Sequence, residues 1–123
     1  MSLTIEIYKS DGGKCRIELI GRLDTNTATE FDSKIGSVGN QEYPIQVVDL
    51  AGLDYVSSAG VRSLFKARKG AHEHGGQLLL VNPQPQVKKV FDIIKALPST
   101  AIFASTEEMD RYLDAMQKKS STE

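Results

Sequence analysis

The 123-residue chain contains a single cysteine, Cys15, which excludes a disulfide bond within the chain. Cys15 alternates with apolar residues, so we expect a buried structural thiol in a protein of a reducing compartment. Apolar runs such as Leu78 to Val81 are far too short to cross a bilayer. The first residues are strand-like and lack a basic segment followed by an apolar stretch. We therefore expect no signal peptide, no membrane contact and a cytoplasmic location.

The sequence also lacks an excess of charge of either sign. Fifteen basic residues face sixteen acidic ones, and this balance does not favour binding to nucleic acid or to an anionic membrane. Basic residues cluster on two predicted helices, at Lys66, Arg68 and Lys69 and at Lys88 and Lys89. A solvated helix face is the simpler interpretation of both clusters, and a patch that contacts a partner is the alternative.

Side chains suited to catalysis or metal binding are few. The only histidines are His72 and His74, and His72 lies about 20 Å along a helix from Ser58. Ser58 therefore lacks a general base, and it does not occupy a Gly-x-Ser-x-Gly turn. Zinc, EF-hand and Walker spacings are missing from the sequence. We therefore expect a protein that is not an enzyme and that has no catalytic residue, metal or cofactor. The alternative from a different functional class is a small enzyme or a ligand-binding protein.

The periodicity of apolar residues predicts elements in the order ββαβαβαβα. This order favours an α/β fold, a single domain with a mixed central β-sheet and about four helices packed on it. Alternating or β-branched segments predict the strands and three- to four-residue spacing predicts the helices. The predicted strands cover residues 3–8, 15–24, 45–50, 77–81 and 101–104, and the predicted helices cover residues 27–38, 58–74, 87–97 and 105–116.

Several boundaries of these elements carry specific signals. Thr27 with Glu30 and Ser105 with Glu108 have the spacing of a capping box at a helix start. Residues 51–57 are expected to form a loop that leads from the third strand to the second helix. The polar residues 118–123 are expected to form a disordered C-terminal tail.

Two adjacent serines, Ser57 and Ser58, stand where the second predicted helix begins. A helix N-terminus presents unsatisfied N–H groups and a partial positive charge, so a phosphoserine is tolerated there. The phosphate would add almost two negative charges to the surrounding surface, and if that surface binds a partner, phosphorylation becomes an off switch. A serine that only caps the helix is the alternative, and spacing alone favours it.

Four segments with characteristic residues follow one another along the chain. They are Gly21-Arg22-Leu23-Asp24, the stretch from Val48 through Ser57-Ser58-Ala59-Gly60 to Val61, Gly75-Gly76 before Leu78, and the helix that contains Val87-Lys88-Lys89-Val90-Phe91. Together they resemble bacterial anti-sigma factor antagonists of the STAS family. The resemblance extends from about Leu3 to Met116. It implies a single STAS-like domain over residues 1–117.

The resemblance implies a mechanism by partner switching. An unphosphorylated antagonist binds an anti-sigma factor that is also a serine kinase, and this binding frees the sigma factor. The kinase phosphorylates the antagonist on a serine at the start of the second helix, and binding is lost. A serine phosphatase then restores the active form. The chain itself is expected to be a monomer.

The family pattern at the phosphorylated serine is Asp-Ser-Ser/Thr-Gly. Alignment on Gly60 places the acceptor at Ser58, with Ser57 as the runner-up. Ser57 then stands where the family has an acidic residue, and Ala59 replaces the second hydroxyl. The residues expected to bind the partner are Asp24, Thr25, Asp54, Tyr55, Ser57, Ser58, Ala59, Gly60 and Arg62.

Structural roles remain open for several of these residues. Asp24 and Thr25 would also serve as turn or helix caps, and Asp54 and Tyr55 as loop packing. Gly60 is expected to allow a close approach between helix and loop. An alternative function within the same fold is a STAS scaffold subunit of a signalling, secretion-control or lipid-transport complex, without a phospho-switch.

Overall fold

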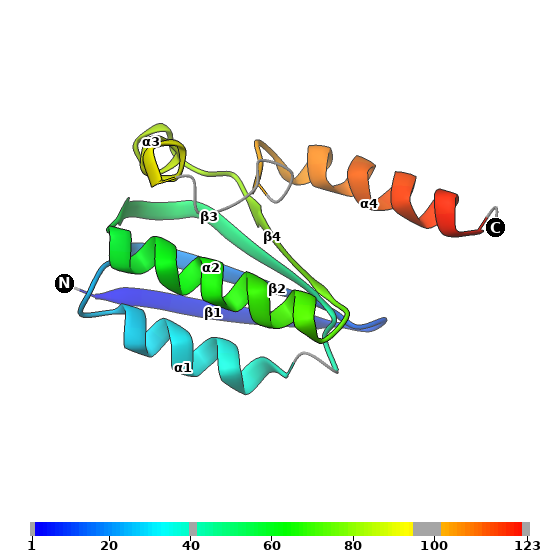
Figure 1. Cartoon of the computed structure of the whole chain (residues 1–123), viewed down its shortest axis with the longest axis horizontal. Coiled ribbons are helices and arrows are strands. Elements are labelled where there is room, and N and C mark those ends of the chain that lie inside the picture. The colour runs from blue at the N-terminus through cyan, green and yellow to red at the C-terminus, as the bar shows by residue number, and fades with distance from the viewer. Residues whose placement is uncertain (1, 40–41, 95–101, 122–123) are drawn as a thin grey trace.

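The computed structural model of the chain describes residues 2–39, 42–94 and 102–121, and its elements follow the predicted order (Figure 1). The five strands form one sheet in the order β1-β2-β3-β4-β5; β1 and β2 are antiparallel and the other neighbours are parallel. The predicted α/β fold with a mixed sheet is confirmed. The elements are β1 (Leu3–Ser10), β2 (Lys14–Leu23), α1 (Ala28–Val38), β3 (Ile45–Val56), α2 (Ser58–Glu73), β4 (Gln77–Val81), α3 (Pro85–Ile94), β5 (Ile102–Phe103) and α4 (Thr106–Ser121).

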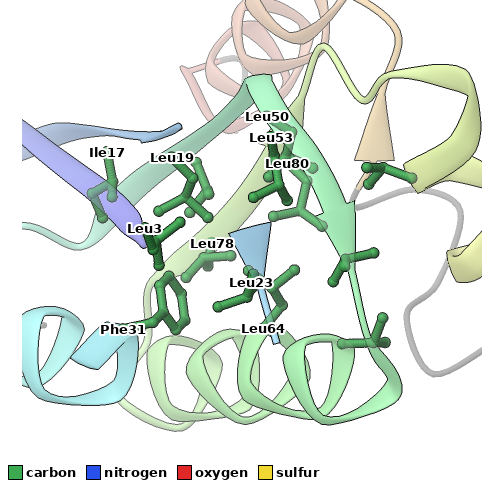
Figure 2. Close-up of a cluster of buried hydrophobic side chains, with 14 of the residues drawn as sticks. Leu3, Ile17, Leu19, Leu23, Phe31, Leu50, Leu53, Leu64, Leu78 and Leu80 are labelled. Atoms are coloured by element: carbon green, nitrogen blue, oxygen red, sulfur yellow. The ribbon is translucent and has the colours of Figure 1, made fainter. Parts of the chain in front are cut away.

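The helices divide between the two faces of the sheet, and the alternation of side chains along β4 shows how. Leu78 and Leu80 point into the larger core, where α1 and α2 cover the sheet (Figure 1). Phe31 of α1 and Leu64 of α2 lie among the leucines of the strands there (Figure 2). On the opposite face, Leu79 and Val81 join a smaller core with Met109 of α4. The buried members of this core are Val47, Leu79, Val81, Phe103 and Met109. The period-two pattern of a strand covered on both faces is thus realised in β4.

The third strand is longer than the sequence predicted. The prediction ended it at Leu50 and made residues 51–57 a loop, which is wrong, because β3 continues to Val56. Leu53 and Val56 are buried and hold this extension against the core. Pairing with β2 continues through two register shifts, between Glu18 and Ile20 and between Gly21 and Arg22. Residues such as Asp54 and Tyr55 therefore lie on a strand and not on a loop.

The two predicted capping boxes have different outcomes. At α4 the Ser105 side chain caps the helix, since its Oγ accepts from the Glu108 N–H at 3.2 Å. The Glu108 carboxylate reaches back to the Ala104 N–H at 3.1 Å, one residue before the N-cap N–H of the standard box. At α1 the prediction is wrong, since the Thr27 side chain caps no N–H of the helix. Thr27 Oγ1 instead donates to the Arg22 carbonyl at 2.9 Å, because the threonine is buried beneath the preceding turn.

Some predicted boundaries fall at the limits of the described chain. The predicted end of the third helix at Leu97 and the first residue of the predicted last strand, Ala101, lie outside the described residues. The helix α4 runs to Ser121, and so into the segment 118–123 for which a disordered tail was expected. The boundary of the domain at residue 117 stays a prediction.

Among the described helices, none combines the length and the hydropathy that a bilayer crossing requires.

Cys15 is fully buried in the core, as the sequence predicted. Burial raises the pKa of its thiol above the ordinary value, and the nearby charge of Lys9 offsets only part of this rise. The thiol therefore stays protonated at neutral pH, which is the state of an inert structural cysteine.

Asp49, near the middle of β3, is the centre of a polar network on the α4 side of the sheet. Its carboxylate lies 2.6 Å from Arg16 Nη2, and it accepts from the Ala51 N–H at 3.0 Å and from the Asn82 amide at 3.1 Å. Burial raises the pKa of Asp49, but the hydrogen bonds and the Arg16 charge outweigh this effect and hold the pKa below its ordinary value. The network ties β2, β3 and the end of β4 together.

We predict that Asp49→Asn destabilises the protein by about 1–3 kcal/mol at pH 7, because the charged acceptor of the network is lost. A carboxyl whose folded pKa is lowered contributes stability above its unfolded pKa of about 3.9 and loses it as the pH falls through the folded value. The difference in free energy of unfolding between the two proteins should therefore shrink below about pH 4. Urea unfolding across pH 2–7 measures it, with Asp11→Asn as an exposed control; a difference that persists unchanged at pH 2 contradicts the prediction.

Candidate functional site

The residues predicted to bind a partner meet at one edge of the sheet, where β2 and β3 end and α2 begins. Because β2 and β3 are parallel, Arg22 and Leu23 lie beside Tyr55 and Val56. The turn after β2 carries Asp24 and Thr25, and α2 starts directly after β3. We call this surface the Ser58 edge. It consists of Asp24, Thr25, Asp54, Tyr55, Ser57, Ser58, Ala59 and Arg62, and the remaining predicted residue, Gly60, is buried beneath it.

The two serines at this edge have different environments. Ser57 is the N-cap of α2: its Oγ accepts from the Gly60 N–H at 3.1 Å, and its own N–H donates to the Leu23 carbonyl at 3.0 Å. Ser57 is also half-buried, whereas Ser58 is exposed as the first residue of the helix. The Ser58 hydroxyl has no hydrogen bond to any residue in the described parts of the chain. The capping role that the sequence left open between the two serines thus belongs to Ser57.

Gly60 fixes the start of α2 against the end of β2. A Cβ atom at this position would stand 2.6 Å from the Leu23 carbonyl oxygen and 2.9 Å from both the Leu23 and Val56 side chains. These distances are too short for any side chain, so only glycine allows the approach. The structural role predicted for Gly60 is confirmed, and Ala59 beside it is half-buried.

Asp24 organises the turn between β2 and α1. Its Oδ1 accepts from the Asn26 N–H at 3.0 Å and from the Thr27 N–H at 3.1 Å. Burial raises the pKa of Asp24, but these hydrogen bonds and the Arg22 charge together lower it below its ordinary value. Asp24 therefore carries its negative charge at the Ser58 edge at neutral pH. Thr25, next to it, is exposed.

Arg22 links the two strand ends, and the sequence reasoning missed it. Its guanidinium lies 4.1 Å from the centre of the Tyr55 ring, and its Nε lies 3.7 Å from Asp24 Oδ2. A cation over an aromatic face stabilises the pair and limits the rotamers of both side chains. Tyr55 remains 41% exposed and so presents its ring to solvent in a defined position. The available signal was the place of Arg22 beside Asp24 in a segment already singled out.

Two glutamines at the start of α3 support the other side of this edge, and they too were not predicted. Gln86 Nε2 donates to the Asp54 carbonyl at 3.1 Å. Gln84 Nε2 donates to the Ala51 carbonyl at 2.7 Å and lies 3.4 Å from Asp54 Oδ1. The exposed end of β3 is therefore held by α3 as well as by β2.

The described residues around Ser58 offer no machinery for hydrolysis. His72 lies in the last turn of α2 and His74 is its C-cap, so both stand at the opposite end of the helix from Ser58 (α2 in Figure 1). In the described parts of the chain, acidic, histidine and cysteine side chains form no group that could hold a metal ion. The edge instead combines an exposed hydroxyl, an exposed aromatic ring and fixed charges of both signs. Such a surface is suited to binding another molecule.

The fold and this edge define a class of small α/β binding domains that present a helix N-terminus beside two parallel strand ends. A model of the STAS domain family matches residues 4–109, and the chain belongs to this family. The family assignment suggested by the sequence motifs is confirmed.

Individual relatives are consistent with that assignment. A Bordetella bronchiseptica protein named "Putative anti-sigma factor antagonist BtrV" is 31% identical over 75 residues, which cover 61% of this chain and 65% of that protein, just under two thirds of its length. The structure of the anti-sigma factor antagonist SpoIIAA in its unphosphorylated form has a TM-score of 0.75 at 21% identity, covering 91% of this chain and 97% of that one. Its phosphorylated form, from Bacillus, has a TM-score of 0.68 at 22% identity, covering 89% and 99%.

A membrane protein shares the fold as well. The murine anion transporter Slc26a9 in its inward-facing state has a TM-score of 0.69 at 17% identity. The match covers 93% of this chain but 22% of the transporter. The fold alone therefore does not separate regulators from transporter domains, and the residues of the Ser58 edge carry the functional argument.

We predict that Gly60→Ala destabilises the protein by about 2–4 kcal/mol, because its methyl group would overlap the Leu23 carbonyl and force α2 away from β2. Gly70→Ala is the matched control in the same helix, since a Cβ there meets no atom within 4 Å. The control should be neutral or stabilising by up to about 1 kcal/mol, because alanine is the better helix former. Chemical denaturation of both variants measures the difference. Equal stability of the two variants would show that the close approach is not a constraint.

Proposed function

We propose that this protein is an anti-sigma factor antagonist that binds an anti-sigma factor in its unphosphorylated form and is switched off by phosphorylation of Ser58. The observation that carries the proposal is the contrast between the serines: Ser57 is engaged as the helix cap, and Ser58 is exposed without a hydrogen bond to the described residues. Ser58 is accessible to a kinase, and its modification breaks no bond of the fold.

The environment of Ser58 suits a phosphate. The first turn of α2 contains no acidic residue, so the partial positive charge at the helix start is not already compensated. Transfer of the γ-phosphoryl group of ATP to Ser58 Oγ releases ADP and the hydroxyl proton. It leaves almost two negative charges on an exposed surface. A partner that docks on this surface with acidic groups is then repelled.

The relatives support this choice among STAS functions. The B. bronchiseptica relative carries the name of an anti-sigma factor antagonist, and SpoIIAA is known as one in both an unphosphorylated and a phosphorylated form. The partner-switching mechanism that the sequence motifs imply then gives the chain two partners, an anti-sigma factor with serine kinase activity and a serine phosphatase. The chain itself acts by binding, without catalysis, and as a monomer.

A second candidate function is that of a STAS scaffold in another complex, without a phospho-switch. The likeness to the Slc26a9 transporter shows that the fold also serves inside a larger membrane protein. Ser57 and Ala59 replace the acidic residue and the second hydroxyl of the family pattern, which is the feature of the chain that favours this candidate.

The first test is phosphorylation itself. After incubation with ATP and the anti-sigma factor kinases of its own organism, the intact protein should gain the mass of one phosphate. Ser58→Ala should abolish the gain. Ser57→Asn is the control, because asparagine keeps an oxygen that caps the helix but removes the hydroxyl, and this variant should still be phosphorylated. A phosphate that disappears with Ser57→Asn and persists with Ser58→Ala would reassign the acceptor.

The second test concerns the effect of charge on binding. Ser58→Asp should weaken the complex with the anti-sigma factor about ten- to hundredfold, because the carboxylate places negative charge on the docking surface. Ser58→Asn has nearly the same shape without the charge and should bind within about threefold of the unmodified protein. Calorimetric titration of both variants gives the two dissociation constants. Equal constants for Asp and Asn would exclude an electrostatic switch and favour the scaffold function.

A further inference from the structure

One face of α2 continues the Ser58 edge along the helix. Ser58, Arg62, Phe65 and Lys69 recur at intervals of three and four residues, so they lie on the same side of the helix. All four are exposed, and Phe65 keeps 38% of its surface in contact with solvent although it is aromatic. This side of α2 thus presents a hydroxyl, then positive charges with one aromatic ring between them.

Arg62 is the first charged residue after Ser58 on this face. The two residues are four positions apart, a separation that brings Cβ atoms within about 5–6 Å. Helical side chains lean toward the N-terminus, so the Arg62 side chain extends back over the turn that Ser58 begins. A negative group that precedes a positive one by four residues is also the favourable order in a helix.

Arg62 has no partner in the described parts of the chain. It takes part in none of the ion pairs, which involve Lys14, Arg16 and Arg22 as the cations. The other charged groups at the Ser58 edge are already engaged. Asp24 accepts two backbone hydrogen bonds and faces Arg22, which also lies against the Tyr55 ring, and Asp54 lies against Gln84. An anion placed on Ser58 therefore has Arg62 as its uncommitted cationic neighbour.

We propose that a phosphate on Ser58 acts through Arg62. When Ser58 is unmodified, Arg62 contacts an acidic group of the partner. When Ser58 is phosphorylated, Arg62 pairs with the phosphate instead. A guanidinium binds phosphate oxygens through two parallel hydrogen bonds, which lysine does not match. Phosphorylation then adds negative charge and withdraws a positive group from the same docking surface. This inference rests on the proposed function and names the residue that carries its regulation.

The side chains on this face of α2 indicate the chemistry of the partner surface. With Ser58 unmodified, the α2 face offers Arg62, Phe65, Lys66 and Lys69 together. This pattern fits an acidic surface with an apolar recess for one aromatic ring. The loss of Arg62 to the phosphate removes the positive charge closest to Ser58 on this face of α2 and leaves the more distant lysines in place.

The experiment measures the second pKa of phosphoserine, whose ordinary value is about 6. Phosphoserine is installed at position 58 of the full chain during translation, so no kinase is needed, and ³¹P NMR follows its titration near physiological ionic strength. A nearby positive charge favours the dianion and lowers this pKa. Arg62→Ala should therefore raise the titration midpoint by about 0.3–0.7 pH unit relative to the protein with Arg62.

Lys69→Ala is the matched control, since it removes an equal charge from the same face of α2. Lys69 lies about 16 Å from Ser58 along the helix, beyond the Debye length of about 8 Å at physiological salt. Its removal should shift the midpoint by less than about 0.1 unit. Arg62→Lys should recover part of the shift, because it restores charge but not the planar contact.

The outcomes separate this inference from the proposed function. Equal midpoints for Arg62→Ala and Lys69→Ala would overturn the role of Arg62 and leave phosphorylation of Ser58 intact. A chain that no kinase of its organism modifies would overturn the proposed function, even with the expected midpoints. A raised midpoint in Arg62→Ala alone supports the pairing.

Discussion

The contact between Gly60 and the Leu23 carbonyl determines the geometry of the Ser58 edge. At this point the first turn of α2 stands against the end of β2 with no space for a side chain. The Ser57 N–H completes the contact with its hydrogen bond to the same carbonyl. This backbone contact holds the first turn of α2 against the end of β2. Ser58 lies on the other side of that turn and is therefore exposed to solvent. The position of the Ser58 hydroxyl is thus set by packing on the opposite side of the helix.

The parallel pairing of β2 and β3 then decides which residues share the edge with Ser58. Parallel strands end at the same side of a sheet, so the turn that carries Asp24 and the strand end that carries Tyr55 come together although about thirty residues separate them in sequence. Arg22 bridges the two through its contacts with the ring and the carboxylate. The backbone of this surface comes from three elements, and each is held by pairing in the sheet or by the Ser57 cap. Under the proposed function, such preorganisation would reduce the entropy that binding costs.

The sequence predicted the order of elements, the mixed sheet, the buried Cys15 and the role of Gly60, since each depends on local periodicity or on one residue's conformational needs. It did not predict the extension of β3, because residues 51–55 lack the density of β-branched side chains that marks a strand. That extension depends on pairing with β2 through shifted register, which is a tertiary effect. The capping box at Thr27 failed for a similar reason, as the threonine is buried and bonds to Arg22 instead. Partnerships such as Arg22 with Tyr55 join distant segments, and one sequence holds no local signal for them.

Under the proposed function, the division of roles between the two serines would let this surface change its charge without losing a hydrogen bond of the fold. If the modified serine were also the cap, a phosphate would remove the hydrogen bond to Gly60 and cost the helix about 1 kcal/mol. With Ser57 as the cap, modification of Ser58 leaves that bond and the Gly60 contact unchanged. The phosphate also meets a helix start that carries no other anion. Under the proposed function, a phosphate on Ser58 would therefore act on the complex with a partner and not on the cap of α2.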